Sequence, residues 1–429
     1  MAILIMVVAS NVVAFSRRYL AGDRNRGLHL ALVGLLSASV LVMAFALHLA
    51  IFAAAWAVSN LLLVRLMMHK WKWSAARNSG FLALKTFGLG FALLLAGFLL
   101  LANATGSMQI PLILESPGIH SSQAFVGLLL IALAAMTQSA VWPFHRCLLS
   151  SLNSPTPVSA LMHAGLVNGG GFVLVRFAPA FVQFPVLLHF LFLMGLASAL
   201  IGTFWKLLQG DIKRMLACST MGQMGFMLMQ CGMGLFASAV SHLCWHGLFK
   251  AFSFLNAGSA IRDTRCDLNS ASVTIPNFLL AGLAGVSGSL TFVVTSGIEF
   301  SLNHTGCLMA GIAFMASSQM ALGFLETKRS AKTILALPLI GLVSGGSYGL
   351  SVLGVDSILE PLQLNRPQPL DAFYLSGFLL LSLVWVSRNA PVSNHIKSLS
   401  LWKRVYVMAL NGSQPHPSTM TASRNHYGI

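Results

Sequence analysis

The sequence predicts an all-α fold, a polytopic membrane bundle of about thirteen transmembrane helices with a broken, glycine-rich helix and a carboxy-terminal amphipathic helix. Of the 429 residues, 56% are hydrophobic and only 8% are charged, and the mean hydropathy is +0.78. Apolar runs of roughly 20 residues, the length that a helix needs to cross a bilayer, recur along the chain. Soluble globular domains do not have this composition.

The predicted spans follow one another with short connections. They are residues 2–16, 28–47, 49–68, 80–102, 123–142, 156–179, 187–207, 213–234, 237–260, 274–298, 305–325, 333–354 and 372–388. The first span lacks the charged start and the small-residue cleavage site of a signal peptide, so we do not expect cleavage. We divide the chain into amino-terminal helices (1–122), a core (123–262), carboxy-terminal helices (263–392) and a cytoplasmic helix with a tail (393–429).

Basic residues lie mostly in alternate loops. One set of loops carries nearly all of the loop Lys and Arg, whereas the opposite set carries only Arg366. Cytoplasmic loops are enriched in Lys and Arg. We therefore predict a multi-pass membrane protein with its amino terminus outside and its carboxy terminus in the cytoplasm. The net charge of +16 then reflects membrane topology and contact with lipids, and we expect no nucleic-acid partner.

The span 237–260 carries three groups that accept or donate protons, His242, His246 and Lys250. Positions i, i+4 and i+8 of a helix share one face, about 6 Å apart along the axis. Ionisable side chains inside a membrane are costly and are usually functional. Burial disfavours their charged forms, so a buried lysine exchanges protons nearer neutral pH than a lysine in water. The spacing predicts a proton relay; snorkelling of Lys250 to the cytoplasmic edge is the alternative.

A second part of the relay is predicted in the span 156–179. It begins with Ser154-Pro-Thr-Pro157 and carries His163, which needs a partner or water inside a membrane, followed by Asn168. The triplet Gly169–Gly171 allows close helix packing or bending, and both interpretations stay open. We add His163 to the relay and treat Asn168 as a possible accessory group.

Polar residues also mark the span 213–234. Asp211-Ile-Lys213-Arg214 at its start is explained most simply as an interfacial anchor, and Lys213 is a possible entry group for ions. The same helix then carries a polar stripe that would hydrogen-bond across helices or hold water. The stripe consists of Ser219, Thr220, Gln223 and Gln230.

We expect no cofactor in this chain. The six cysteines are scattered without a C-x-x-C pair, and neither G-x-G-x-x-G nor a P-loop occurs. Residues 395–410 place apolar side chains at helical spacing between basic ones, which is typical of a helix lying on the inner membrane surface. The polar stretch that follows would be a disordered tail or a docking peptide.

Four ordered motifs resemble the antiporter-like membrane subunits of respiratory complex I and of Mrp-type cation/proton antiporters. They begin at Trp142 (WPFH), Ser154 (SPTPVSALMHA), Asp211 (DIKRMLACSTMGQ) and His242 (HLCWHGLFKA). The resemblance covers residues 120–262 strongly and 1–100 weakly. It implies an ion-conducting subunit, and it places the first residue at about the fourth helix of a full-length subunit.

The sequence departs from that superfamily at three positions. Ala57 after Trp56 replaces the usual glutamate of an early span, and Gln138 before Ser139-Ala140 replaces the usual lysine of the broken helix. No lysine lies between Lys250 and Lys328, so the usual late-helix lysine is also missing. The resemblance implies gating by a carboxylate–lysine pair, which these changes put in doubt. Gln138 and Gln223 are kept as possible accessory groups.

Finer features resemble the DabB subunits of DAB-type inorganic carbon accumulation systems. They are the segment from His163 to Phe172, the segment from Gln223 to Gly232, and the ending from Leu410 to Tyr427. This resemblance implies a large soluble zinc protein related to β-carbonic anhydrases, docked on the cytoplasmic face, with the zinc in that partner. The docking residues would be His416, Arg424, His426 and Tyr427.

Three functions fit the sequence. The favoured one is a proton- or sodium-conducting subunit that energises hydration of CO2 to bicarbonate by the soluble partner. The second is an ion-translocating subunit of an NADH:quinone oxidoreductase-like or Mrp-like complex. The third is a non-conducting membrane anchor, which the lost family charges favour and the retained row of His and Lys opposes.

Overall fold

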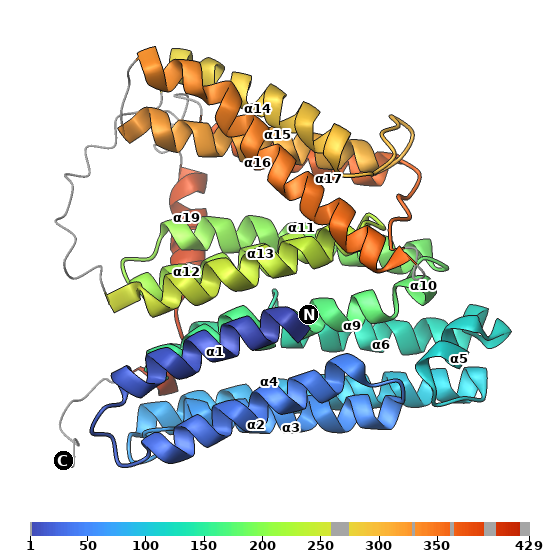
Figure 1. The fold of residues 1–429 in the computed structure, drawn as a ribbon, viewed down its shortest axis with the longest axis vertical. Coiled ribbons are helices and arrows are strands. Elements are labelled where there is room, and N and C mark those ends of the chain that lie inside the picture. The colour runs from blue at the N-terminus through green and yellow to red at the C-terminus, as the bar shows by residue number, and fades with distance from the viewer. Residues whose placement is uncertain (1, 259–273, 328–330, 361–363, 390–399, 421–429) are drawn as a thin grey trace. The chain divides into compact units, whose positions relative to one another are not determined.

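The computed structural model describes residues 2–258, 274–327, 331–360, 364–389 and 400–420. The described chain consists of helices and short connections (Figure 1). The helices are α1 (Ala2–Tyr19), α2 (Arg26–Phe45), α3 (Leu49–Met67), α4 (Ser74–Thr105), α5 (Ile110–Glu115), η1 (Pro117–His120), α6 (Ser122–Gln138), α7 (Arg146–Leu149), η2 (Ser151–Asn153), α8 (Thr156–Leu161), η3 (Met162–Leu166), α9 (Asn168–Arg176), α10 (Ala178–Phe181), α11 (Pro185–Leu207), α12 (Ile212–Gly232), α13 (Phe236–Leu255), α14 (Ile275–Thr295), α15 (Gly306–Thr327), α16 (Ala331–Ile358), α17 (Ala372–Asn389), α19 (Ser400–Gly412) and η6 (Pro417–Thr419). The predicted all-α fold is confirmed.

Each predicted span coincides with a helix or with a run of helical segments. Among the described residues, ten helices are long and apolar enough to cross a membrane. The helix α6 is apolar but has only 17 residues. The number of thirteen spans is therefore not confirmed, although every predicted span is helical.

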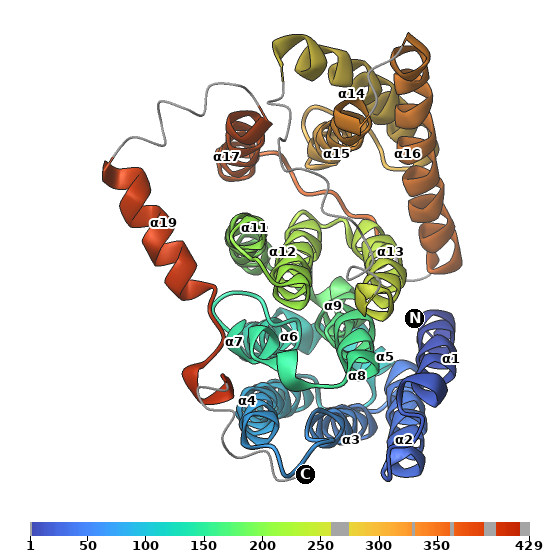
Figure 2. The ribbon, with the colours of Figure 1, turned by 90° about the vertical axis from the view of Figure 1, so that its left-hand side faces the viewer.

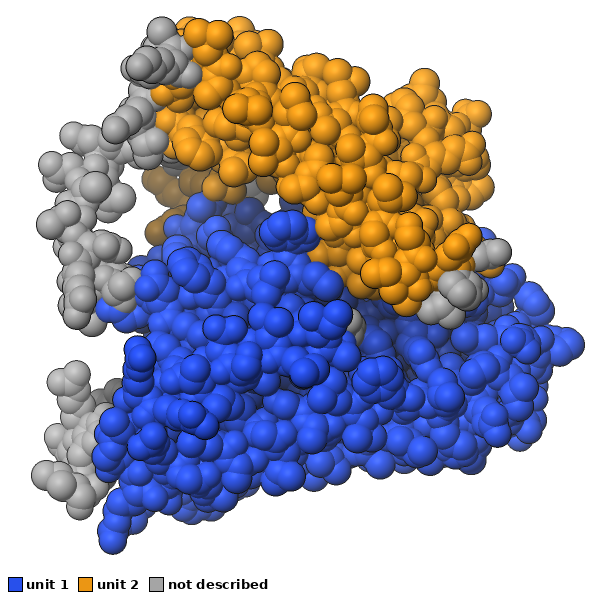
Figure 3. Space-filling model, viewed as in Figure 1, with its two compact units in different colours: residues 1–229, 242–261, 410–429 blue, residues 230–241, 262–409 orange. Residues whose placement is uncertain are grey.

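Two compact units make up the chain (Figure 3). Unit 1 contains residues 1–229, 242–261 and 410–429, and unit 2 contains residues 230–241 and 262–409. The candidate functional residues, apart from those outside the described ranges, all lie in unit 1.

In unit 1, α2, α3 and α4 lie side by side, and α4 also packs along α6 (Figure 2). Small residues permit this contact between α4 and α6. A side chain on Gly97 would meet the Gly127 carbonyl oxygen at 2.7 Å, so the two backbones approach closely at this point. Close approach of this kind is common between helices in membranes.

The helices near the predicted site are interrupted twice. After α6 ends at Gln138, Ala140 takes a left-handed conformation (φ 49°), and the Trp142–Pro143 peptide bond is cis. The span that follows is α8, then the π-helix η3, then α9. Such π-helical turns often mark functional sites. The Asn168 side-chain amide donates to the Ala164 carbonyl oxygen (2.8 Å), which satisfies one backbone group of η3.

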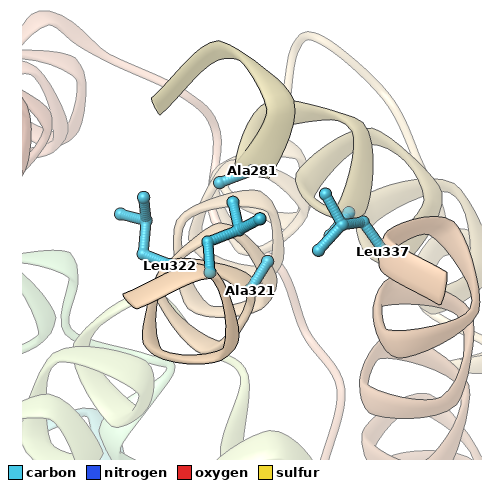
Figure 4. Packing of buried hydrophobic residues seen from close by; sticks show 6 residues of the cluster. Ala281, Ala321, Leu322 and Leu337 are labelled. Atoms are coloured by element: carbon cyan, nitrogen blue, oxygen red, sulfur yellow. The ribbon is translucent and has the colours of Figure 1, made fainter. Parts of the chain in front are cut away.

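Unit 2 has its own core, formed by α14, α15 and α16 (Figure 4). The buried residues of this core are Ala281, Ala284, Ala321, Leu322, Leu325 and Leu337. Its alanines and the close contact of Gly345 with Gly288 bring the helices together. The carboxy-terminal helix, predicted over residues 395–410, is seen as α19; residues 395–399 lie outside the described ranges.

Candidate functional site

Three of the four predicted relay residues, His242, His246 and Lys250, follow one face of α13. Together with His163, these residues are called the row. The imidazole rings of His242 and His246 are nearly parallel, with centroids 6.2 Å apart. His246 is buried, and Lys250 is fully buried (0% exposed) although it is among the largest side chains of the core. Its ammonium lies 5.5 Å from the centre of the Phe249 ring. Lys250 therefore does not snorkel to an exposed edge in this structure.

A hydrogen-bonded chain joins Lys250 to His163. The Lys250 ammonium donates to the Leu216 carbonyl oxygen (3.2 Å), and the Thr220 hydroxyl donates to the same oxygen (3.0 Å). Because the Thr220 proton is used in that bond, its oxygen accepts from Nδ1 of His163 (3.0 Å). His163 thus carries its proton on Nδ1, and Nε2 is left as the proton acceptor.

The second histidine of the row is oriented in the same way. Asn168 donates through its amide to Ala164, so its carbonyl oxygen accepts from Nδ1 of His246 (3.3 Å). Nε2 of His246 is buried without a hydrogen-bond partner among the described residues. Buried polar atoms normally have partners. This nitrogen is therefore placed to accept a proton or a water molecule.

His242 completes the row at its other end. Its Nε2 is also buried without a partner in the described part of the chain, and the backbone of Gln223 hydrogen-bonds the ring. The Phe226 ring packs against it with centroids 5.1 Å apart. The side chain of Gln223 is exposed, so this predicted accessory residue contributes through its backbone.

Gln138 lies in a neighbouring polar contact and not in the row. Its side chain exchanges two hydrogen bonds with Asn60 of α3 (3.1 and 3.0 Å) and donates to the Leu166 carbonyl oxygen of η3 (3.2 Å). A pocket beside it is lined by Trp56, Ser59 and Gly169. The neutral amide therefore links α3 and α6 to the π-helix that carries His163.

Lys213 stands at the start of α12, one turn before Leu216. Its ammonium donates to the Ser154 carbonyl oxygen (3.4 Å), immediately before α8. Lys213 and Lys250 both repel positive charge at His163. The Asp211 carboxylate accepts from the backbone N–H of Arg214 (2.9 Å) and so caps the start of α12. The interpretation of this segment as an interfacial anchor stays a prediction.

The predicted docking residues are only partly described. Nδ1 of His416 and the Ser418 hydroxyl hydrogen-bond one another (2.8 Å), so this ring is engaged within the tail. Arg424, His426 and Tyr427 lie outside the described residues. Docking of a partner by these four residues stays a prediction.

The connecting oxygen of Leu216 was not predicted. Thr220 belongs to the predicted polar stripe, but every residue has a carbonyl group, so no sequence signal marks the one that bridges Lys250 and Thr220. Gly247 allows the close packing on which this bridge depends, because a side chain at this position would meet the Ala164 oxygen at 3.0 Å. This glycine brings α13 against η3.

Residues 46–276 match the transmembrane family described as NADH:quinone oxidoreductase/Mrp antiporter. This match covers more than half of the chain and includes every residue of the row. The chain belongs to this family. The resemblance of the four motifs to this superfamily is therefore confirmed.

Curated relatives include proteins named for inorganic carbon transport. The chain is 36% identical over 305 residues to the probable inorganic carbon transporter subunit DabB1 of Halothiobacillus neapolitanus, covering 66% of this chain and 54% of that protein. It is 37% identical over 264 residues to the probable inorganic carbon transporter subunit DabB of Bacillus subtilis, covering 61% and 52%. The chain spans about half the length of these two relatives.

Among solved structures, the fold is similar to a chain in the Mrp complex from Dietzia sp.. The TM-score is 0.63 at 22% sequence identity, and the similarity covers 96% of this chain and 51% of that chain. At this identity the similarity establishes the fold alone.

Proposed function

We propose that this chain is a proton- or sodium-conducting membrane subunit that energises hydration of CO2 to bicarbonate. The observation that carries the proposal is the hydrogen-bonded link from Lys250 to His163, with His246 and His242 continuing along the same face of α13, in a family of antiporter-like subunits. The similarity to proteins named inorganic carbon transporter subunits supports the choice of bicarbonate as the product.

The row supports conduction because it contains both proton acceptors and a proton donor. Nε2 of His242 and of His246 each offer a lone pair, and Lys250 offers protons to the Leu216 oxygen. A proton that reaches Nε2 of His246 makes the ring cationic. When His242 or His246 then releases a proton to a bridging water molecule, its ring becomes neutral again. Loss or gain of a proton by Lys250 in the same way changes the charge next to Thr220 and His163.

The ion gradient would supply the free energy. A potential of about 100 mV provides roughly 2.3 kcal/mol for each charge that crosses the membrane. At about 1.4 kcal/mol per tenfold change in an equilibrium constant, one charge biases a hydration equilibrium by about 50-fold. Ion re-entry that alters the charge of Lys250 would therefore bias the hydration equilibrium towards bicarbonate by this factor for each charge.

The hydration chemistry would belong to a partner. We assign it to a large soluble, carbonic-anhydrase-like zinc protein on the cytoplasmic face, whose zinc lowers the pKa of bound water and generates hydroxide near neutral pH. This chain would hold no cofactor, would lie in the bacterial inner membrane with its carboxy terminus in the cytoplasm, and would present its basic loops and tail to that partner.

A second candidate is an ion-translocating subunit of a quinone oxidoreductase or Mrp-like complex, which the family description favours. Ala57 and Gln138 oppose it, since the glutamate and lysine of those subunits are replaced by neutral residues. The third candidate is a membrane anchor that conducts no ions. It requires that the buried His and Lys side chains of the row take no part in proton transfer.

Purification of the tagged full-length protein from native membranes in mild detergent distinguishes these functions. Mass spectrometry and metal analysis of the co-purified proteins are the readouts. We expect one large soluble zinc-bearing protein. Several antiporter subunits or iron–sulfur proteins in its place would contradict the inorganic carbon function and move the chain to a respiratory or Mrp-like complex.

A further inference from the structure

A second group of titratable side chains lies away from the row, where the ends of α1 and α3 meet the start of α2. It consists of Asp23, His29 and His69, together with Ser16 of α1. His29 and Ser16 are fully buried (0% exposed), and the side chain of Asp23 is 27% exposed. Ionisable groups withdrawn from water in a membrane protein are costly to keep unless they are used.

These side chains form a path from a partly exposed carboxylate to a buried hydroxyl. The Asp23 carboxylate and Nε2 of His69 are 3.1 Å apart, and the His69 and His29 rings meet edge to face with centroids 5.2 Å apart. Nε2 of His29 lies 3.4 Å from the Ser16 hydroxyl. Nδ1 of His29 is buried with no hydrogen-bond partner among the described residues. A purely structural pair would not be expected to leave this nitrogen unsatisfied.

The groups around the path keep its outer end ionised. Burial opposes ionisation of Asp23, but the Asn25 N–H, the hydrogen bond and charge of His69, and Lys70 together lower the pKa of its carboxyl group. Asp23 is therefore ionised near neutral pH and accepts a hydrogen bond from Nε2–H of His69, and it holds a transferred proton only briefly before water takes it. His69 and Asp23 are the charged groups that act on His29. The remaining charged side chains nearby are exposed, and they are Arg17, Arg18, Arg24 and Arg26.

One helix connects this group with the row. The helix α1, which carries Ser16, packs against α8 and against the π-helix that holds His163. Tyr19 at the end of α1 lies near Lys213 at the start of α12. The group thus opens on the basic side, which we predict to be cytoplasmic, next to the same helix ends as Lys213.

We propose that Asp23, His69 and His29 transfer protons between the aqueous phase on the basic side and the interior of unit 1. Next to the ionised Asp23, Nε2 of His69 carries the proton and its Nδ1 is free to accept one. In the direction of release, the Asp23 carboxylate takes the Nε2 proton of His69 and gives it to water, while Nδ1 of His69 takes the Nδ1 proton of His29. Nε2 of His29 then takes the Ser16 hydroxyl proton, which Ser16 regains from water inside unit 1. Uptake runs these steps in reverse, and in both directions each group gains one proton and loses one. The inference rests on the proposed function, because it requires that protons move through the chain.

Proton flux into liposomes that contain the complete complex, followed with an entrapped pH-sensitive dye, tests the inference. We expect Asp23→Asn and His29→Gln each to lower the flux at least about tenfold, because positioned proton-transfer groups contribute roughly 10²–10⁴ in rate. Asp23→Glu retains the carboxylate and should retain most of the flux. Arg24→Gln, which removes an exposed charge from the same loop, is the matched control.

The pH profile separates proton transfer from a structural role. The defect of Asp23→Asn should diminish as the bulk pH falls, since more protons then reach His69 directly; a structural defect would not diminish. Asn has the shape of Asp at this partly exposed position, so this result stands even if His29→Gln does not assemble. If Asp23→Asn and His29→Gln leave the flux unchanged while Lys250→Ala abolishes it, proton transfer through Asp23, His69 and His29 is overturned and the proposed function stands. Unchanged flux in Lys250→Ala would overturn the proposed function as well.

Discussion

The Leu216 carbonyl oxygen is the point at which two parts of the row meet. It accepts from the Lys250 ammonium and from the Thr220 hydroxyl, and Thr220 in turn holds Nδ1 of His163. Phe254 stacks on the His163 ring with centroids 4.3 Å apart and limits its rotation. A change in the charge of Lys250 therefore alters the hydrogen bonds of the Leu216 oxygen and the Thr220 hydroxyl, and through them the hydrogen bond of His163.

Replacement of Thr220 by Val tests this link. Valine has nearly the shape of threonine but cannot accept the Nδ1 proton of His163, which leaves a buried donor unsatisfied at a cost of about 1–3 kcal/mol. We expect a lower thermal midpoint and a loss of proton flux. Thr220→Ser keeps the hydroxyl and serves as the control. Equal flux in the valine and serine variants would show that the hydroxyl does not take part in conduction.

At the scale of elements, the carboxy-terminal tail forms hydrogen bonds with the connection between α6 and α8. The backbone N–H of His416 donates to the Ser150 hydroxyl (2.9 Å), and the Asn153 amide donates to the Thr419 carbonyl oxygen (2.8 Å). The His145 ring packs edge to face on Trp205, with centroids 4.8 Å apart. A side chain on Gly412 would meet the same Trp205 at 2.8 Å. Tail, connection and α11 therefore meet at one place.

Acid should loosen this contact through His145. Burial, with the adjacent Arg146, lowers the pKa of His145 to about 4. In the unfolded chain histidine titrates near 6.5, so between about pH 6.5 and about pH 4 only the unfolded state binds this proton, and stability falls as the pH falls, by up to about 3 kcal/mol. We expect the thermal midpoint of His145→Asn to drop less than that of the wild type between about pH 7.5 and about pH 5. The exposed His120→Asn is the control, and an equal drop in all three proteins would contradict this role.

The sequence predicted the helices and the row, but not how the row is connected. Apolar length located each span, and the four-residue spacing placed His242, His246 and Lys250 on one face. The π-helix around His163 and the left-handed Ala140 have no local signal, because their neighbours are ordinary helix-forming residues whose conformation is set by packing. Gln138 was considered an accessory to the row, whereas the structure places it in a separate contact with Asn60.

At the scale of the whole molecule, this chain lacks some of the charged residues that the superfamily usually has inside the membrane and keeps the central ones. Ala57 and Gln138 remove a carboxylate and a lysine, while Lys250 stays fully buried among His163, His246 and the α12 carbonyl groups. A buried amine is costly even when it donates one hydrogen bond. Conduction gives Lys250 a use that justifies this cost, whereas the anchor function gives it none.

Proton flux through the reconstituted complete complex, compared between wild type, Lys250→Ala and Lys85→Ala, tests that claim most directly. Lys85 is an exposed lysine on α4 and controls for the loss of an amine from a spanning helix. We predict that Lys250→Ala assembles normally and loses at least about 100-fold in flux, and that Lys85→Ala stays within about twofold of the wild type. Wild-type flux in an assembled Lys250→Ala complex would contradict the account.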